Sequence, residues 1–222
     1  MGCMHDPSDT VVRNMLQIID CGVADYRQVL RQQVEIHAQR LAGQVPDTVL
    51  VCEHPAVVTL GARRTANRLL ASPEQLAGQG IEVVEVTRGG GTTAHNPGQL
   101  VLYPILDLRK RGLSAGPYVR TLEAIGLELL RTLGLQAKTR KGLPGLWVED
   151  RKIASIGVRV SKGVTFHGMA VNIRNDLRIF DLVVPCGLDG VRMTSHLKET
   201  GNACPMAVAK ARLNELLIEH LS

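Results

Sequence analysis

Three β-type stretches separated by two short turns occupy residues 145–173, and this run restricts the possible folds more than any other. Turn residues stand at Glu149-Asp150 and at Lys162-Gly163, and apolar residues alternate with others along the stretch between them. Strands joined by such turns are neighbours in a sheet. The sequence therefore predicts a meander of strands as a central part of the fold.

The remaining pattern adds helices and further strands to this sheet. Apolar residues at helical spacing predict a helix over 25–42, with Val29 and Val34 on its stripe, a second helix opening at Pro117, and a third over 205–220. The predicted strands cover residues 15–20, two short pieces within 48–61 bent at Pro55, the stretch IEVVEV and the stretch QLVLYPILDL. An α+β class follows. We expect a single domain over residues 1–222, with a flexible stretch at 1–12.

The charge and the cysteines limit the partners and the compartment. The net charge of +5 favours acidic partners. Only 3% of the residues are aromatic and the basic clusters at 109–111 and 138–141 are short, which argues against nucleic acid. No apolar run is long enough for a membrane span, and residues 1–14 lack a signal-peptide pattern. Five widely spaced cysteines without a CxxC motif indicate free thiols and a cytoplasmic protein.

A glycine-rich loop, RGGGTTAHNPGQ, covers residues 88–99. Its Gly-x-Gly-x-x-Ala spacing matches a dinucleotide fingerprint, but that motif needs a helix at once, whereas Pro97, Gly98 and a β-type run follow here. The loop therefore indicates backbone that contacts a ligand, flanked by Arg88 and His95. A wide glycine turn with an incidental histidine is the alternative. The histidines and cysteines lack the local spacing of a zinc site.

Lys152 begins an apolar alternation. Counting by two from it gives Ala154, Ile156, Val158 and Val160, so one regular strand would place Lys152 at the edge of an apolar face. Burial disfavours the charged ammonium form, which suits a lysine for proton transfer near neutral pH. The alternative is a lysine at a strand end whose ammonium reaches water.

Cys186 lies in a Pro-Cys-Gly peptide within residues 181–191. Pro185 fixes its own φ and Gly187 can adopt angles that other residues avoid. Such a bend can present a thiol at a set angle, and it can equally be an ordinary turn. His167, two residues before Met169 on the following strand pattern, is a core or ligand-lining candidate without a catalytic role.

Four stretches taken together resemble the octanoyltransferases of lipoic acid assembly, over roughly residues 15–220. They are EHPAVVTLG, RGGGTTAHNPGQLVLYPILDL, GLWVEDRKIASIGVRVSKGVTFHGMAVNI and VVPCGLDG. The resemblance implies a mixed, largely antiparallel sheet flanked by helices, with one substrate tunnel. This is the biotin and lipoate protein ligase-like fold, itself similar to the class II aminoacyl-tRNA synthetases.

The same resemblance implies the reaction and its residues. Octanoyl passes from acyl carrier protein to a specific lysine of a lipoyl domain, in 2-oxoacid dehydrogenases and the glycine cleavage H protein, without a cofactor, a metal, nucleic acid or a membrane. Cys186 would be the nucleophile, forming an acyl thioester, and Lys152 the base. The acyl chain would lie against Arg88, Gly89, Gly90, Gly91, Thr92, Thr93, Ala94, His95, Ser155, Ile156, Gly157, Gly168, Met169 and Ala170.

The loop departs from the family pattern at three positions. Gly91 replaces a larger residue, Ala94 an aromatic one and Asn96 a glycine, and we expect the lost aromatic ring to widen or reshape the acyl pocket. Three other functions remain as alternatives: an ATP-dependent lipoate or biotin ligase on the same fold, a non-catalytic module that binds the carrier protein, and a nucleic-acid binder.

Overall fold

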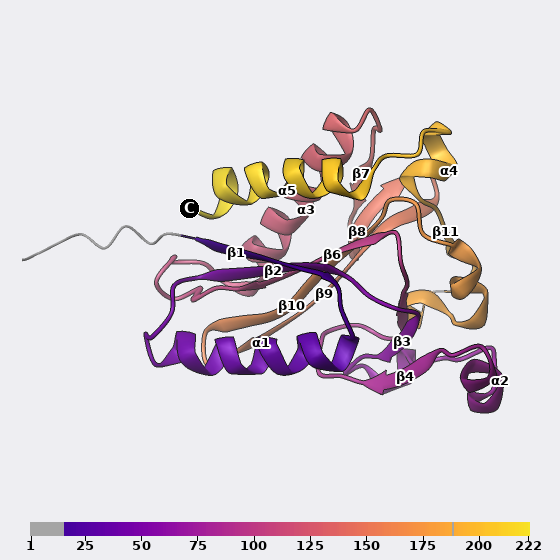
Figure 1. Cartoon of the computed structure of the whole chain (residues 1–222), viewed down its shortest axis with the longest axis horizontal. Helices are drawn as coiled ribbons and strands as arrows, with labels where there is room; N and C mark the ends of the chain where they lie inside the picture. Colours follow the sequence, from indigo (N-terminus) through magenta and orange to yellow (C-terminus); the bar gives the residue numbers. More distant parts are fainter. Residues whose placement is uncertain (1–15, 188) are drawn as a thin grey trace, which may run out of the picture.

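The predicted meander forms the centre of a mixed sheet. The structure is a computed structural model that describes residues 16–187 and 189–222. Within these residues one sheet has the strand order β1-β2-β6-β10-β9-β8-β7, with β11 paired to β9 (Figure 1). The β1–β2 and β9–β11 pairs are parallel and the other pairs are antiparallel. The strands are β1 (Gln17–Val23), β2 (Thr48–Glu53), β6 (Gln99–Ile105), β7 (Lys138–Arg140), β8 (Leu143–Val148), β9 (Arg151–Ser161), β10 (Val164–Asn172) and β11 (Arg192–Met193).

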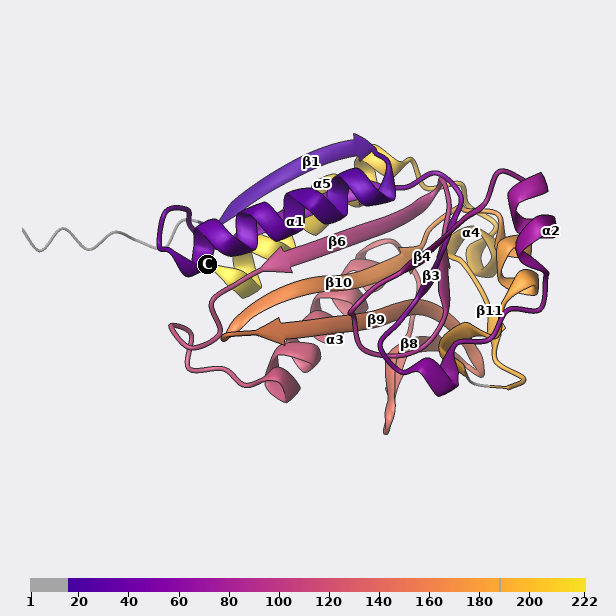
Figure 2. The ribbon, with the colours of Figure 1, turned by 90° about the horizontal axis from the view of Figure 1, so that it is seen from below.

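Long helices cover both faces of this sheet. Helix α1 (Tyr26–Leu41) packs on one face, against β6 and β10, whereas α3 (Ala115–Thr132) and α5 (Met206–Leu221) pack on the other (Figures 1 and 2). The side chain of Asp25 accepts a hydrogen bond from Gln28 N–H, which caps the start of α1. None of the described helices combines the length and the apolar character needed to cross a membrane.

A smaller sheet and several short helices lie near one end of the main sheet (Figure 2). Its strand order is β4-β3-β5, and β5 packs against the turn that carries Cys186. The elements are β3 (Val57–Leu60), β4 (Glu82–Glu85), β5 (Thr93–His95), α2 (Pro73–Gly78), α4 (His196–Thr200), η1 (Arg64–Ala66), η2 (Leu177–Leu182) and η3 (Pro185–Gly187).

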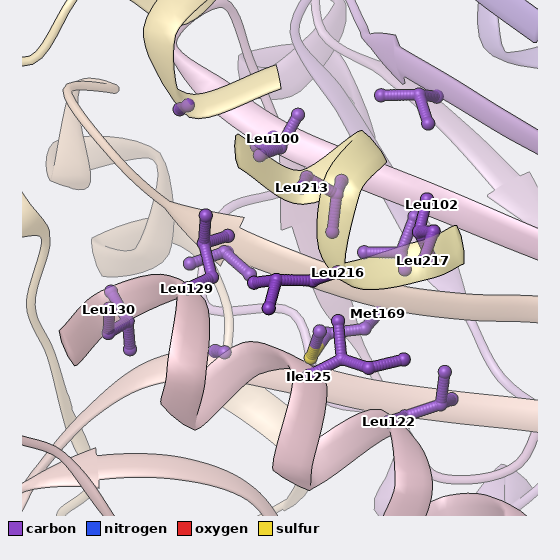
Figure 3. Close-up of a cluster of buried hydrophobic side chains, with 14 of the residues drawn as sticks. Leu100, Leu102, Leu122, Ile125, Leu129, Leu130, Met169, Leu213, Leu216 and Leu217 are labelled. Atoms are coloured by element: carbon purple, nitrogen blue, oxygen red, sulfur yellow. The ribbon is translucent and has the colours of Figure 1, made fainter. Parts of the chain in front are cut away.

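The alternation along the central strands divides the interior into two cores. Leu100 and Leu102 of β6 join the core beneath α3 and α5, whereas Val101 and Tyr103 join the core beneath α1. Figure 3 shows the first core, in which Leu129 of α3 and the leucines of α5 meet Met169 of the sheet. Burial on both faces explains why β6 is an almost continuous apolar run.

Most of the predicted elements are confirmed. Strands β8, β9 and β10 are adjacent and antiparallel, and the α+β class is confirmed. Helix α3 begins at Ala115, two residues before the predicted Pro117. Val34 was placed wrongly on the buried stripe of α1, because it is 53% exposed whereas Gln33 and Arg40 are buried. The expectation for residues 1–12 lies outside the described residues.

A buried ion cluster joins three parts of the chain around Asp47. Arg40 Nε of α1 donates to Asp47 Oδ1 at 2.6 Å, and Arg111 Nε donates to Oδ2 at 2.5 Å. The backbone N–H of Asp107 also donates to Oδ1. Burial raises the pKa of Asp47, but the hydrogen bonds from Arg40, Asp107 and Arg111 outweigh it, so the pKa lies below its usual value.

Replacing Asp47 by asparagine is expected to lower the free energy of unfolding at pH 7 by about 3 kcal/mol or more, because it leaves buried guanidinium charge uncompensated. A lowered pKa stabilises the fold above the unfolded value near 3.9, and this contribution disappears as the pH falls through the folded value. Urea unfolding should therefore show the difference shrinking below about pH 4. Asp176→Asn, in an exposed pair with Arg178, is the control and should change stability far less.

Candidate active site

The glycine loop is fixed by its own arginine and by two neighbouring segments. Arg88 is 7% exposed, and its guanidinium donates to Gly91 O at 2.7 Å and to Thr59 O at 2.9 Å. The backbone N–H of Gly89 donates to Val158 O of β9 at 2.9 Å. Arg88 therefore shapes the loop from within and holds it against β9.

Two of the glycines near this loop lie where neighbouring backbone atoms come too close for a side chain. A Cβ on Gly91 would lie 2.2 Å from Ala66 O, and a Cβ on Gly61 would lie 2.3 Å from Gly90 O. Neither position leaves room for a side chain. The glycine at 91, which departs from the family pattern, is thus required by the path of η1 in this chain.

A small cavity lies between the glycine loop and strands β6, β9 and β10. We call it the inner cavity; its volume is about 40 Å³. The structure places eleven of the residues predicted to bind the acyl chain around it: Arg88, Gly89, Gly90, Thr93, His95, Ser155, Ile156, Gly157, Gly168, Met169 and Ala170. Tyr26, Val101, Tyr103 and His167 complete the lining. His167 was expected as a core or ligand-lining residue, whereas the other three were not predicted. Tyr26 comes from α1, far from the other lining residues in the sequence, and no local motif predicts this contact.

Three of the predicted residues, Gly91, Thr92 and Ala94, are not among those that line the inner cavity. Because side chains alternate along β5, Thr93 and His95 face the cavity while Ala94 joins a separate apolar cluster that includes Val58 and Phe180. Ala94 lies in this cluster and not in the lining of the inner cavity, so the expectation that the lost aromatic ring at 94 widens or reshapes the acyl pocket stays a prediction.

Gly168 lines the inner cavity, and close packing also requires a glycine at this position. A Cβ on it would lie 2.2 Å from Leu102 O of the neighbouring strand β6. His167, just before it, has a φ of 55°, in the left-handed region, and its backbone N–H donates to Gln33 Oε1 of α1 at 3.0 Å. This geometry brings the His167 side chain to the cavity wall.

The buried histidines at the inner cavity are held uncharged. His95 Nδ1 lies 2.6 Å from Gln99 Oε1, and because the Gln99 amide donates to Ala94 O and Asn172 Oδ1, His95 is the donor. Burial, and then the neighbouring His54, lower the pKa of His95 to about 3. Burial and Arg88 lower the pKa of His167 to about 3. The inner cavity is therefore polar at this wall without carrying histidine charge.

A histidine titration followed by NMR should show His95 and His167 uncharged from pH 8 down to about pH 4. An unfolded histidine takes up a proton near pH 6.5, so these two oppose folding increasingly as the pH falls below that value. Stability should accordingly decline from pH 6.5 to pH 4. Titration of either imidazole near pH 6.5 in the folded protein would contradict the burial argument.

Lys152 lies in a second, more open space, which we call the outer cavity, of about 260 Å³. Its lining comprises Arg63, Gly89, Gly90, Val119, Gly142, Leu143, Pro144, Lys152, Ile156, Gly157 and Val158. Lys152 is only 1% exposed, and Nζ lies 5.4 Å from the centre of the Trp147 ring. The alternative of a lysine whose ammonium reaches water is therefore wrong.

The simple alternation assumed a regular strand, but β9, the strand that carries Lys152, is irregular. The register between β8 and β9 shifts by one residue between Leu146 and Trp147, so Lys152, Ile153 and Ala154 are buried in succession. Such a bulge redirects side chains next to it. Lys152 nevertheless shares the outer cavity with Ile156 and Val158, as the alternation predicted, while Ile153 joins the core beneath α3 and α5.

Cys186 lies in the short turn η3 (Pro185–Gly187); its side chain falls outside the described part of the structure. A Cβ on Gly187, whose φ is 68°, would lie 2.6 Å from Cβ of Ala66. Since Ala66 also contacts Gly91, the turn is held close to the glycine loop. Downstream, Met193 pairs with Lys152, so the segment after the turn leads directly to that lysine.

The other described cysteines are poor candidates for a nucleophile. Cys52 and Cys204 are buried and Cys21 is half-buried, and burial raises the pKa of all three thiols. None of them lines either cavity. A thiol with a raised pKa carries little thiolate, which is the reactive form.

The chain is similar in sequence to a family model and to octanoyltransferases of several organisms. Residues 25–218 match the family model described as "Lipoyl protein ligase A/B catalytic domain". The octanoyltransferase of Roseiflexus sp. is 45% identical over 209 residues, which cover 93% of this chain and 85% of the relative. The mitochondrial octanoyltransferase LIP2 of Arabidopsis thaliana is 41% identical over 191 residues, 86% of this chain and 81% of the relative.

Solved structures with the same fold are more distant in sequence. A P. falciparum LipL1 complex with lipoate gives a TM-score of 0.75 at 13% identity and covers 93% of this chain but 62% of that chain. Lipoate-protein ligase A bound with ATP gives 0.69 at 15% identity, with 93% and 84% covered, and biotin protein ligase from Aquifex aeolicus gives 0.53 at 12% identity, with 93% and 68% covered. These likenesses confirm the predicted ligase-like fold. With its family model and its relatives, the chain belongs to the octanoyltransferase family of acyltransferases.

Proposed function

We propose that this chain transfers an octanoyl group from acyl carrier protein to a lysine of a lipoyl domain through a thioester on Cys186. The observation that carries the proposal is the position of Lys152. It is a nearly fully buried amine in a cavity with aliphatic walls, and that cavity shares Gly89, Gly90, Ile156 and Gly157 with the inner cavity. Membership of the octanoyltransferase family indicates that the transferred group is octanoyl. The two cavities provide space for its chain.

In the first half-reaction the thiol of Cys186 gives its proton to the amine of Lys152, and the thiolate attacks the carbonyl carbon of the donor thioester. The bond between this carbon and the donor sulfur then breaks, and the departing sulfur takes the proton back from Lys152. One thioester replaces another, so no oxidant and no ATP are consumed.

In the second half-reaction the amine of the lipoyl-domain lysine attacks the octanoyl-Cys186 thioester. An amide bond forms, the Cys186 sulfur leaves, and Lys152 takes the proton that the amine loses and returns it to that sulfur. The product amide is more stable than a thioester, which drives the overall transfer.

The acyl chain is proposed to extend from the outer cavity into the inner one, past the residues that both share. The inner cavity is narrow, so entry of the chain requires side chains to move. We expect Met169 of the lining to move most readily, because an unbranched thioether is especially adaptable.

The proposed partners and compartment follow from charge and from thiol chemistry. A net charge of +5 suits acidic carrier proteins and acidic lipoyl domains, including those of 2-oxoacid dehydrogenases and the glycine cleavage H protein. Free cysteines at 21, 52 and 204 suit a reducing compartment such as the cytoplasm.

The test is transfer of octanoyl from purified octanoyl-carrier protein to a purified lipoyl domain, without ATP or metal, read by intact-protein mass. A lipoyl domain heavier by one octanoyl group supports the proposal. Modification that needs free octanoate and ATP would instead identify a ligase on the same fold, and carrier binding without any transfer would identify a binding module.

A further inference from the structure

The outer cavity has two basic residues and no acidic side chain among the described residues that line it. Arg63 is a permanent cation at its wall, and Lys152 is the other basic residue. The remaining side chains in the wall are aliphatic, from Val119, Leu143, Ile156 and Val158, with Pro144 beside them. A molecule that fits this space has an anion at one end and an uncharged, partly apolar body.

We infer that the outer cavity binds the phosphate-bearing arm of the acyl donor, a phosphopantetheine-type thioester, and that Arg63 holds its phosphate. This inference rests on the proposed function and names a subsite for the donor. We assign the thioester end of the arm to Lys152, which is buried at the cavity wall, and the phosphate end to Arg63, whose side chain is exposed to solvent.

The position of Arg63 is fixed although its side chain is exposed. Its backbone N–H donates to Gly90 O at 3.1 Å, and Ala62 N–H donates to Arg88 O at 2.9 Å, so this segment is tied to the glycine loop. Arg63 forms no ion pair with any of the described residues. A guanidinium presented in this way offers several N–H donors to phosphate oxygens.

The charge of the cavity favours the donor arm over the acceptor lysine as its occupant. A lysine side chain arrives as an ammonium ion, and the guanidinium of Arg63 would repel it. A phosphodiester carries a negative charge that Arg63 attracts. We therefore assign the cavity to the donor arm, which leaves as a free thiol before the acceptor amine attacks.

The neighbouring arginine provides a matched control. Arg64 is also exposed, but it lines a different hollow, together with Asn67, Glu85 and Val86. Removing Arg64 takes away the same charge, one residue along the chain, without touching the outer cavity. A general effect of net charge would therefore affect both variants alike.

The experiment compares two small donors, octanoyl-phosphopantetheine and octanoyl-pantetheine, which differ only in the phosphate. The rate of Cys186 acylation is followed by intact mass, and kcat/KM is obtained for each donor. In the unmodified enzyme and in Arg64→Ala the phosphorylated donor should be preferred by about 10-fold or more, the size expected of a charge-assisted contact. In Arg63→Ala the ratio should fall to about one, and Arg63→Lys should keep part of it.

Two results would overturn the inference. One is an unmodified enzyme that acylates at equal rates with both donors, and the other is an Arg63→Ala variant that keeps the full preference for phosphate. Failure of the proposed function looks different, because then neither donor yields an acyl-enzyme. Small donors carry no protein surface, so the ratio reports the arm alone and not the docking of an acidic carrier.

Discussion

Replacement of Cys186 by serine is expected to reduce octanoyl transfer at least about 1,000-fold, the scale seen when a covalent nucleophile is lost. A serine hydroxyl is close in size to the thiol but is a far weaker nucleophile, and it ionises much less readily than a thiol. The measurement is a single-turnover assay in which the acyl-enzyme is detected by intact mass. No octanoyl adduct should form on the variant, and thermal unfolding should show that the fold is retained.

The matched control is Cys204→Ser, which removes another thiol from the same chain. Cys204 lies 9% exposed at the edge of the core beneath α3 and α5, and burial raises the pKa of its thiol. This variant should keep most of the activity. Normal transfer by Cys186→Ser, or an adduct that moves to another residue without loss of rate, would contradict the thioester mechanism.

The sequence predicts the main sheet well because the strands of this part of the fold show a local alternation of apolar and other residues. Each strand of the meander carries its own alternation, and the two turns at Glu149-Asp150 and Lys162-Gly163 set their order. Short elements such as α2 and β5 have no such period. Their form depends on neighbours distant in sequence, as when Thr93 of β5 pairs with Thr59 of β3.

The candidate site is predicted in part for the same reason. The glycine loop and the Ser155–Gly157 and Gly168–Ala170 stretches are contiguous motifs, and the structure gathers them around the inner cavity. Tyr26 and Tyr103 come from elements whose pattern is that of ordinary buried positions. The alternation predicts that Lys152 shares a face with Ile156 and Val158, but it does not reveal the one-residue bulge opposite Trp147 or that the lysine is only 1% exposed.

Replacement of Lys152 by methionine is expected to slow both half-reactions by about 100-fold or more, the usual contribution of a positioned proton-transfer group. Methionine keeps the unbranched shape of the side chain but removes the amine, which lies 5.4 Å from the centre of the Trp147 ring. Acylation of Cys186 and transfer to the lipoyl domain are measured separately, each in a single turnover. Lys210→Met is the control, because Lys210 is a partly buried lysine that pairs with Asp20 and lines neither cavity.

An arginine at 152 separates the two ways in which Lys152 could act. Arginine keeps the positive charge but does not release its proton in a protein. If Lys152 acts by moving protons, Lys152→Arg should be about as slow as Lys152→Met in both half-reactions. If it acts only as a cation that favours the Cys186 thiolate, Lys152→Arg should retain a fast iodoacetamide reaction at neutral pH and near-normal acylation. If both rates are unchanged in Lys152→Met, Lys152 has no part in the mechanism. Each role proposed for Lys152 needs either its charge or its amine, and methionine has neither.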